Sequence, residues 1–183
     1  MSEIAMAKRI EPLADLVFAA NSVSLDPLEP GTRIVLRARP EGMAAAKKVL
    51  GVALPTKPKS SAVKGTVHCL WIGPDEWLIL DEEGSALPAK FEKAGNSKMA
   101  AVDVSHRNTA IRVSGANCVA VLNSGCPQDL SIEAFPIGAA SRTILGKAEV
   151  ILYRTGANEF RVECWRSFSN YVWKYLVDAV KSV

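Results

Sequence analysis

Two histidines are the side chains in this sequence best suited to acid–base chemistry, because imidazole titrates near neutral pH. They are His68 and His106. Ser105 stands directly before His106, but neighbouring residues of a strand point to opposite faces, so this pair cannot act as nucleophile and base unless the chain bends sharply there. His68 lies in an apolar segment, where we expect a structural, hydrogen-bonded histidine. The histidines alone therefore predict no catalytic site.

Two further groups of polar residues could do chemistry or make contacts. The polar segment from Asp103 to Arg107 follows an apolar Ala-Ala-Val strand, and polar groups at such a place need hydrogen-bond partners or an interface. The sequence leaves both roles open. Asp75 and Glu76 are adjacent acids in a predicted turn, and that position explains them without paired-carboxylate catalysis.

Other motifs give no positive signal for metal or nucleotide chemistry. The cysteines are too widely spaced for a CxxC redox pair or a paired zinc-ligand cluster, so we expect buried thiols. They are Cys69, Cys118, Cys126 and Cys164. The Gly-Lys pair at 146 is followed by alanine where a phosphate loop has Ser or Thr, and no GxGxxG occurs. We expect no metal site here and no nucleotide held by either loop.

Basic residues are concentrated in one part of the chain. Positions 33 to 64 hold eight lysines and arginines and a single acid, Glu41, whereas the whole chain has a net charge of +3. This segment could steer an anionic ligand or an acidic partner, and a solvated face is the plainer alternative. A nucleic-acid interface is disfavoured because the aromatic rings that would stack on bases lie elsewhere in the sequence.

The elements that must position these residues occur twice in the same order. Alternation predicts a strand over 32–39 whose arginines, Arg33, Arg37 and Arg39, face solvent. A helix over 43–50 follows and ends at Gly51. A hairpin over 67–80 turns at Gly-Pro-Asp-Glu, and a second helix begins at Ala86 with Ser85 as its N-cap.

The second series has a strand over 101–113, a helix over 116–123 and a hairpin over 148–164. In this hairpin Phe160, Val162 and Cys164 form the inward face, and Arg161 and Glu163 lie on the other face. The last helix, with Ser167 as its expected N-cap, has the strongest apolar stripe of the chain. The stripe is Phe168, Tyr171, Val172, Tyr175, Leu176, Ala179 and Val180.

These patterns predict an α+β fold built from a duplicated strand, helix, hairpin, helix unit. The first 30 residues are expected to form an arm with a short helix over 13–20, because Pro27 and Pro30 then interrupt regular structure. Residues 31–183 are expected to form a single domain of two pseudo-repeats, about 31–97 and 98–183, since either unit alone would expose one face of its sheet.

Tryptophans lie near both hairpins. Trp71 and Trp77 flank the first turn. Trp173 falls off the apolar stripe of the last helix and has Arg166 nearby, which is the composition of a protein interface.

Six strings carry family information. They are WIGPDEWLIL, DVSHRNTAIRVSG, NSGCPQDL, FPIG, LGKAEVILYR and FRVECWRSFSNYVWKYL. Together they resemble the gamma subunit of bacterial heterotetrameric sarcosine oxidase, from about Gly51 to Ala179. WIGPDEW, WRSF and YVW are specific to that family, whereas residues 33–50 match it only in pattern.

The resemblance implies a four-subunit flavoenzyme that oxidatively demethylates sarcosine with oxygen and tetrahydrofolate. The products are glycine, hydrogen peroxide and methylenetetrahydrofolate, or formaldehyde without folate. It also implies that FAD, FMN, NAD and tetrahydrofolate are bound by other subunits. The fold looks like the duplicated folate-binding domain of glycine-cleavage aminomethyltransferases, with Asp103 to His106 and SGANCVAVL as the matching strand and helix. Their GGxxDD-type acidic strand is absent from this sequence.

The chain is accordingly expected to be a non-catalytic structural subunit with alpha, beta and delta partners, chiefly alpha. An independent folate-binding, aminomethyltransferase-like protein is the alternative. The residues expected at the subunit contact are Trp71, Asp75, Trp77, Asp103, His106, Arg107, Arg142, Arg166 and Trp173.

A cytoplasmic location is also expected, without binding to membranes or nucleic acid. The longest apolar stretches, such as Val67 to Gly73, are too short to cross a bilayer, and the first ten residues lack an apolar signal core. A subunit built to be enclosed can self-associate when isolated, because doing so hides its apolar contact surface.

Overall fold

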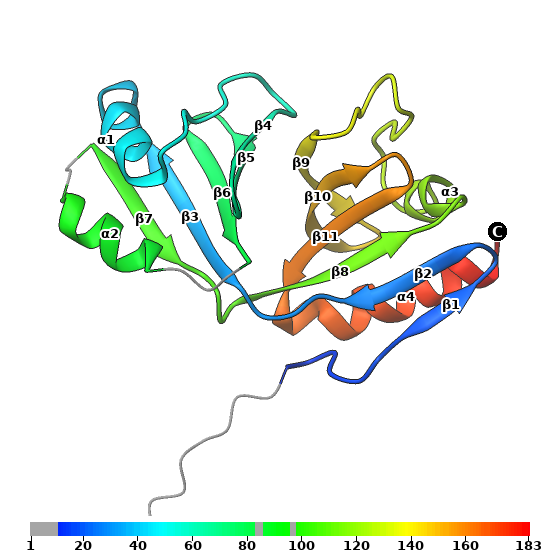
Figure 1. Cartoon of the computed structure of the whole chain (residues 1–183). Helices are drawn as coiled ribbons and strands as arrows, with labels where there is room; N and C mark the ends of the chain where they lie inside the picture. The colour runs from blue at the N-terminus through cyan, green and yellow to red at the C-terminus, as the bar shows by residue number, and fades with distance from the viewer. Residues whose placement is uncertain (1–10, 83–85, 96–97) are drawn as a thin grey trace, which may run out of the picture.

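The computed structural model describes residues 11–82, 86–95 and 98–183. It contains two sheets with helices on their outer sides (Figure 1), and this confirms the predicted α+β class. Ser85, the expected cap of the second helix, lies outside the described residues. In the part of the chain that is described, no helix is both long and apolar enough to span a membrane.

The first sheet has five strands among the described residues, and all neighbours are antiparallel. In spatial order they are β4 (Ser61–Lys64), β5 (Val67–Gly73), β6 (Glu76–Asp81), β3 (Thr32–Ala38) and β7 (Met99–Asp103). The predicted strand and first hairpin are confirmed as β3, β5 and β6. The sequence did not predict β4, because four residues are too few to show alternation.

The second sheet has six antiparallel strands among the described residues. In spatial order they are β1 (Phe18–Ala20), β2 (Val23–Pro27), β8 (Asn108–Ser114), β11 (Glu159–Trp165), β10 (Ala148–Gly156) and β9 (Ala140–Leu145). The second predicted hairpin is confirmed as β10 and β11.

Each sheet is followed by helices at equivalent places. α1 (Pro40–Leu50) and α2 (Leu87–Ala94) come after β3 and β6, whereas α3 (Cys118–Asn123) and α4 (Ser169–Lys181) come after β8 and β11. A 3-10 turn, η1 (Arg166–Phe168), precedes α4. Gly51 ends α1 with φ at 72° and donates its N–H to the Lys47 carbonyl, which confirms the predicted C-cap.

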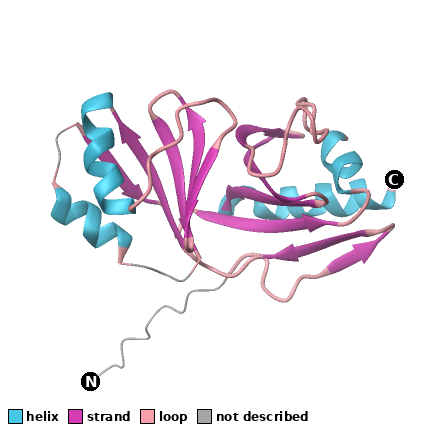
Figure 2. Cartoon of the chain, turned by 45° about the horizontal axis from the view of Figure 1, so that its top comes forward, coloured by secondary structure: helices cyan, strands magenta, loops and turns pink. Residues whose placement is uncertain are grey.

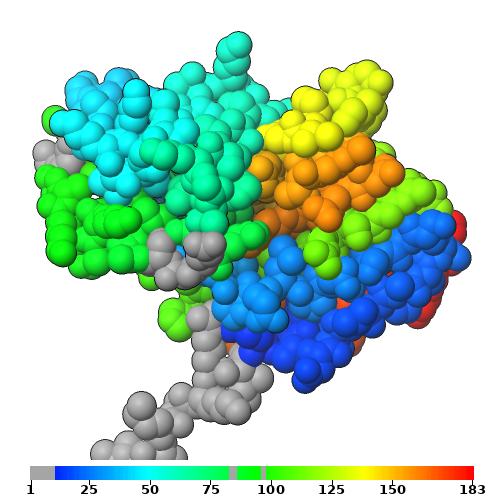
Figure 3. Space-filling model, in the orientation of Figure 1, coloured from blue at the N-terminus to red at the C-terminus, as the bar shows by residue number. Residues whose placement is uncertain are grey.

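The layers follow the order helices, sheet, sheet, helices (Figure 2). One core fills the space between the first sheet and α1 and α2, and a second lies between the other sheet and α3 and α4. A third joins the inner faces of the two sheets through residues such as Leu70, Leu78 and Ala140. The two halves therefore meet along a packed seam (Figure 3).

The two halves also exchange strands. The order β2, β3, α1, β4, β5, β6, α2 is matched by β7, β8, α3, β9, β10, β11, α4. β2 pairs with β8, and β7 pairs with β3, so the leading strand of each series joins the sheet of the other. Backbone hydrogen bonds therefore connect the halves in addition to side-chain packing. The boundaries given above for the pseudo-repeats remain a prediction.

The predicted helix over 13–20 was wrong. β1 occupies Phe18–Ala20 and forms a hairpin with β2 through Asn21 and Ser22, whose φ angles are 48° and 58°. Positive φ at both central residues is typical of the tight turn that matches strand twist. Residues 18–27, within the expected arm, thus belong to the second sheet.

The single strand expected over 101–113 was also wrong. Its residues form β7 and β8, which lie in different sheets and are joined by a turn over 104–107. The Ala-Ala-Val segment is not buried as expected, because β7 is an edge strand on which Val102 is 57 % exposed.

The buried face of α4 is rotated from the predicted stripe. Trp173 is buried together with Val172 and Leu176, whereas Phe168 and Tyr171 are exposed. The Tyr171 hydroxyl accepts the Lys147 N–H at 3.0 Å, so this ring lies over a loop instead of in the core. Ser167 is not the N-cap, since η1 precedes the helix and α4 has no side-chain cap.

Candidate functional site

Four charged side chains form a chain of ion pairs between the sheets. Arg33 on β3 donates from Nε to Glu163 Oε2 at 2.8 Å, and Arg161 donates from Nε to Glu163 Oε1 at 2.8 Å. Arg161 also donates from Nη1 to Glu82 Oε1 at 2.6 Å. Arg33 and Glu163 are each 1 % exposed. Because both Glu163 oxygens accept from arginine, this carboxylate is a structural anion.

The prediction that Arg33 faces solvent was wrong, and the polar face of β11 is buried as well. Alternation shows which face of a strand is apolar, but not whether the opposite face is covered. Here the second sheet covers it. Arg37 and Arg39, at the far end of β3, are exposed as predicted.

One end of the space between the sheets opens as a cavity of about 130 Å³. Val35, Ile72 and Ile151 line it with apolar surface. Arg142 of β9 spans the sheets by donating from Nη2 to Glu76 Oε2 at 2.9 Å. Ligand pockets typically have about 300–1,000 Å³, so this cavity has room for a few waters and is too small for a flavin or a folate.

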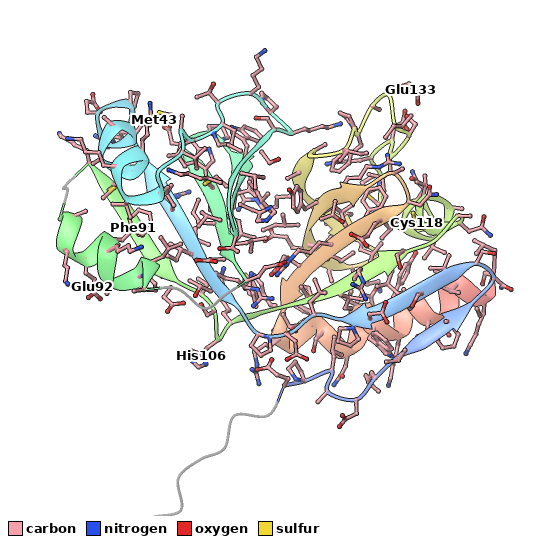
Figure 4. All side chains as sticks on the ribbon, in the orientation of Figure 1. Met43, Phe91, Glu92, His106, Cys118 and Glu133 are labelled. Carbon is pink, nitrogen blue, oxygen red and sulfur yellow. The ribbon has the colours of Figure 1, made fainter. Side chains whose placement is uncertain are left out.

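The turn between β7 and β8 lies beside this cavity. Asp103 Oδ1 accepts the Ser105 N–H at 2.9 Å and the Ser105 hydroxyl at 2.5 Å, and Ser105 Oγ accepts the Arg33 N–H at 2.9 Å. Asp103 and Ser105 therefore close the turn and attach it to β3. His106 is exposed and points away from the body of the protein (Figure 4).

Next to this turn is the Trp165 surface, which we define as Arg107, Trp165, Arg166 and Phe168. The Arg107 guanidinium lies 5.1 Å from the centre of the Trp165 ring, which is 5.9 Å from the Phe168 ring. Both rings are 41 % exposed. The Arg166 N–H donates to the Arg107 carbonyl at 2.8 Å, which fixes the two arginines side by side. Exposed aromatic rings supported by arginines are typical of binding hot spots.

The residues expected at the subunit contact lie in several places. Asp103, His106, Arg107 and Arg166 lie at or beside the β7–β8 turn, and Arg142 borders the same cavity as Arg107. Asp75 is exposed in the β5–β6 turn with φ at 55°.

The three expected tryptophans lie in the cores. Trp77 is buried and donates from Nε1 to the Pro55 carbonyl at 2.7 Å, and Trp71 is half-buried against the same core. Trp173 is buried in the core under the second sheet. Trp77 and Trp173 are therefore removed from the candidate contact residues, because a ring packed under a sheet has no face left for a partner.

The other end of the inter-sheet space contains a hollow of about 290 Å³. His68 Nδ1 lies 3.1 Å from the Tyr153 hydroxyl there, which confirms the expected hydrogen-bonded histidine. Burial lowers the pKa of His68, because it disfavours imidazolium, and raises the pKa of Tyr153. Arg161, already paired with two carboxylates, forms part of the wall.

The four cysteines are buried and unpaired, as predicted. Burial raises the pKa of Cys69 and of Cys164 to about 12, so both remain protonated at neutral pH. A protonated buried thiol is a poor nucleophile and a poor metal ligand. The described residues contain no group of three or more His, Cys, Asp or Glu that could hold a metal.

The sequence reasoning missed Trp165 and Phe168 as surface residues. Trp165 shares the face of β11 that carries Arg161 and Glu163, since side chains two apart point the same way. That alternation was a usable signal that the ring lies outside the core. Phe168 was assigned to the helix stripe because η1 could not be told from the first turn of α4.

The chain matches the model of the "Sarcosine oxidase, gamma subunit family" over residues 36–182. It is 32 % identical over 166 residues to the sarcosine oxidase subunit gamma of Corynebacterium sp. (strain P-1), covering 88 % of this chain and 81 % of that relative. It is 33 % identical over 166 residues to the subunit of the same name from Arthrobacter sp., with the same coverage of each chain.

Two solved structures are similar to it. A chain of the heterotetrameric sarcosine oxidase from Corynebacterium sp. U-96, in complex with pyrrole 2-carboxylate, superposes with a TM-score of 0.88 and 31 % identity, over 95 % of both chains. The glycine cleavage system aminomethyltransferase T from Bartonella henselae gives a TM-score of 0.67 at 13 % identity, over 85 % of this chain and 45 % of that one. The second likeness confirms the expected relation in fold.

Proposed function

The chain belongs to the sarcosine oxidase gamma subunit family and is therefore part of an oxidoreductase complex, and from this premise we propose that it is a structural subunit without a catalytic site of its own. The observation that carries the proposal is the Trp165 surface. Two stacked rings, each 41 % exposed and flanked by arginines, have the composition of a surface that binds another protein.

The interior supports the same proposal. The groups that could transfer protons between the sheets already have partners: Glu163 is held by two arginines, and His68 is held by Tyr153. Reaction at these groups would first require breaking buried ion pairs or hydrogen bonds, which is costly. The packed seam is thus suited to rigidity.

We propose the alpha subunit as the main partner, with beta and delta in the same assembly. FAD, FMN, NAD and tetrahydrofolate are then bound by those subunits, and the complex converts sarcosine to glycine and hydrogen peroxide, with the methyl carbon passed to tetrahydrofolate or released as formaldehyde. We place the complex in the cytoplasm, because four unpaired thiols suit a reducing compartment.

The test is expression of the alpha, beta and delta chains with and without this chain. We expect the complex without it to keep its flavin spectrum and to lose stability, and the isolated chain to leave sarcosine unchanged. Turnover of sarcosine by the isolated chain, or loss of flavin from the complex without it, would contradict the proposal. Calorimetry with tetrahydrofolate addresses the alternative, because saturable binding by the isolated chain would support an independent folate-binding protein.

Paired variants locate the contact. Trp165→Ala with Phe168→Ala is expected to weaken assembly at least about tenfold, since hot-spot rings contribute strongly to affinity. Ile132→Ala with Ile137→Ala is the control, because these side chains are also exposed, at 44 % and 58 %, but lie on the loop before β9. Equal effects of the two pairs would separate assembly from the Trp165 surface.

A further inference from the structure

β7 is an open edge of the first sheet: among the described residues it pairs with β3 alone. The Val104 N–H donates to the Arg33 carbonyl at 2.8 Å, and the Arg39 N–H donates to the Lys98 carbonyl at 3.1 Å. In an antiparallel ladder these bonds occur at alternate residues, so residues 98, 100, 102 and 104 are bonded to β3. The N–H and C=O of Ala101 consequently point toward the open edge.

The side chains of β7 do not protect this edge. Edge strands usually carry charged residues or proline that prevent pairing with another chain. β7 has the sequence Met-Ala-Ala-Val-Asp, and Val102 is 57 % exposed beside Val35 of β3. The middle of the strand therefore offers unpaired backbone and apolar surface together.

A basic hollow adjoins the beginning of β7. It measures about 520 Å³, and Met99 and Ala100 form part of its wall together with Arg37, Arg39 and Lys98. Asp75 is the acidic residue in the wall. The Arg37 side chain is 72 % exposed, although it lies 3.6 Å from Glu76. The net charge of this wall is positive, which attracts carboxylates to one end of the strand.

We propose that β7 accepts an extended segment of another subunit, acidic at one end and apolar in the middle, as an additional strand of the first sheet. This deepens the proposed function and rests on it. The added strand bonds to the N–H and C=O of Ala101, packs an apolar side chain on Val102 and places carboxylates near Arg37 and Arg39. β7 leads through the 104–107 turn to Arg107, so one partner can cover this edge and the Trp165 surface together.

Amide exchange measured residue by residue tests the pairing directly. The assembled complex is labelled in deuterated buffer, quenched, and the chain is read after dissociation. Exchange at Ala101 is expected to be fast in the free chain and slowed by more than about tenfold in the complex, because the amide becomes hydrogen-bonded. Ala100 and Val102 serve as internal controls, since their amides are bonded to β3 in both states.

Charge and edge variants test the chemistry of the partner. Val102→Lys is expected to weaken assembly by about tenfold or more, because a lysine on an edge strand opposes pairing. Val63→Lys is its control, on the opposite edge strand β4, where Val63 is 48 % exposed. Arg37→Gln with Arg39→Gln is expected to weaken assembly by about tenfold and to reduce its salt dependence. Lys47→Gln with Lys48→Gln, on the exposed side of α1, is the matched control. Thermal unfolding checks that each variant is folded.

The outcomes separate the two proposals. A complex that forms while Ala101 continues to exchange fast overturns the added strand and leaves the structural subunit intact. The same holds if Val102→Lys assembles as well as Val63→Lys. A folded chain that fails to assemble with the other subunits under any condition overturns the proposed function, and the added strand with it.

Discussion

Replacing Glu163 with glutamine should be among the most destabilising changes that keep the size of a side chain. The carboxylate is buried between Arg33 and Arg161, with both Nε to oxygen distances at 2.8 Å. The amide of Glu163→Gln can accept from one arginine, but its NH₂ group faces the donor of the other. The variant therefore leaves a buried guanidinium without its anion.

Breaking a buried ion pair by removing one partner costs about 3–5 kcal/mol. Domains of this length lose roughly 2–4 °C in melting temperature per kcal/mol. We therefore expect Glu163→Gln to melt about 6–20 °C below the parent chain. Urea denaturation followed by circular dichroism gives the free energy of unfolding directly.

Two companion variants make this prediction specific. Arg112→Gln removes an exposed ion pair with Asp26, at 3.4 Å, and should cost less than about 1 kcal/mol. Arg33→Met with Glu163→Leu removes the buried pair completely and leaves Arg161 with Glu82, so it should be more stable than Glu163→Gln alone. A loss below about 1 kcal/mol for Glu163→Gln, or a double variant less stable than the single one, would refute the assignment of a buried, charge-dependent pair.

Three further predictions follow from the fold and from the pKa shifts. Cys69 and Cys164, with pKa values raised to about 12, should resist iodoacetamide at pH 8 in the folded chain and react in urea; because the unfolded thiols ionise first, the free energy of unfolding should also fall as pH rises from about 9 toward 12. Since burial lowers the pKa of His68, its contribution is present above the unfolded value of 6.5 and lost as pH falls through the folded pKa; the stability difference between the parent chain and His68→Gln, measured by urea denaturation, should therefore shrink between about pH 7 and pH 5. Fragments 11–95 and 98–183 should each be poorly folded by circular dichroism and should gain structure when mixed, because β2 and β7 each pair in the other fragment's sheet; a fragment that melts cooperatively alone would contradict this.

Local patterns predicted the elements that carry a complete signal within one segment. Alternation identified β3 and the two hairpins, and Gly51 identified the end of α1. These features depend on steric and hydrogen-bonding preferences of neighbouring residues, so no distant contact is needed to recognise them.

Features that depend on pairing between distant segments were missed. The burial of Arg33 follows from Glu163, 130 positions later, and nothing near Arg33 distinguishes it from the exposed Arg37. The division of residues 99–114 into two strands follows from their membership of different sheets. The candidate site was predicted in part: the 103–107 segment and Arg166 lie together, whereas Trp77 and Trp173 were misplaced because size and apolarity suit a core as well as an interface.

The location of the proposed contacts couples assembly to folding. β7 begins the second series but lies in the first sheet, and the 104–107 turn connects it to β8 and the Trp165 surface in the second. A partner on this strand and turn therefore holds both halves at the place where the chain crosses between them. Binding that favours the folded chain stabilises it in proportion to the logarithm of partner concentration. The destabilised Glu163→Gln chain should thus regain melting temperature on assembly, and a variant whose melting temperature stayed unchanged in the complex would show that the partner contacts only one half.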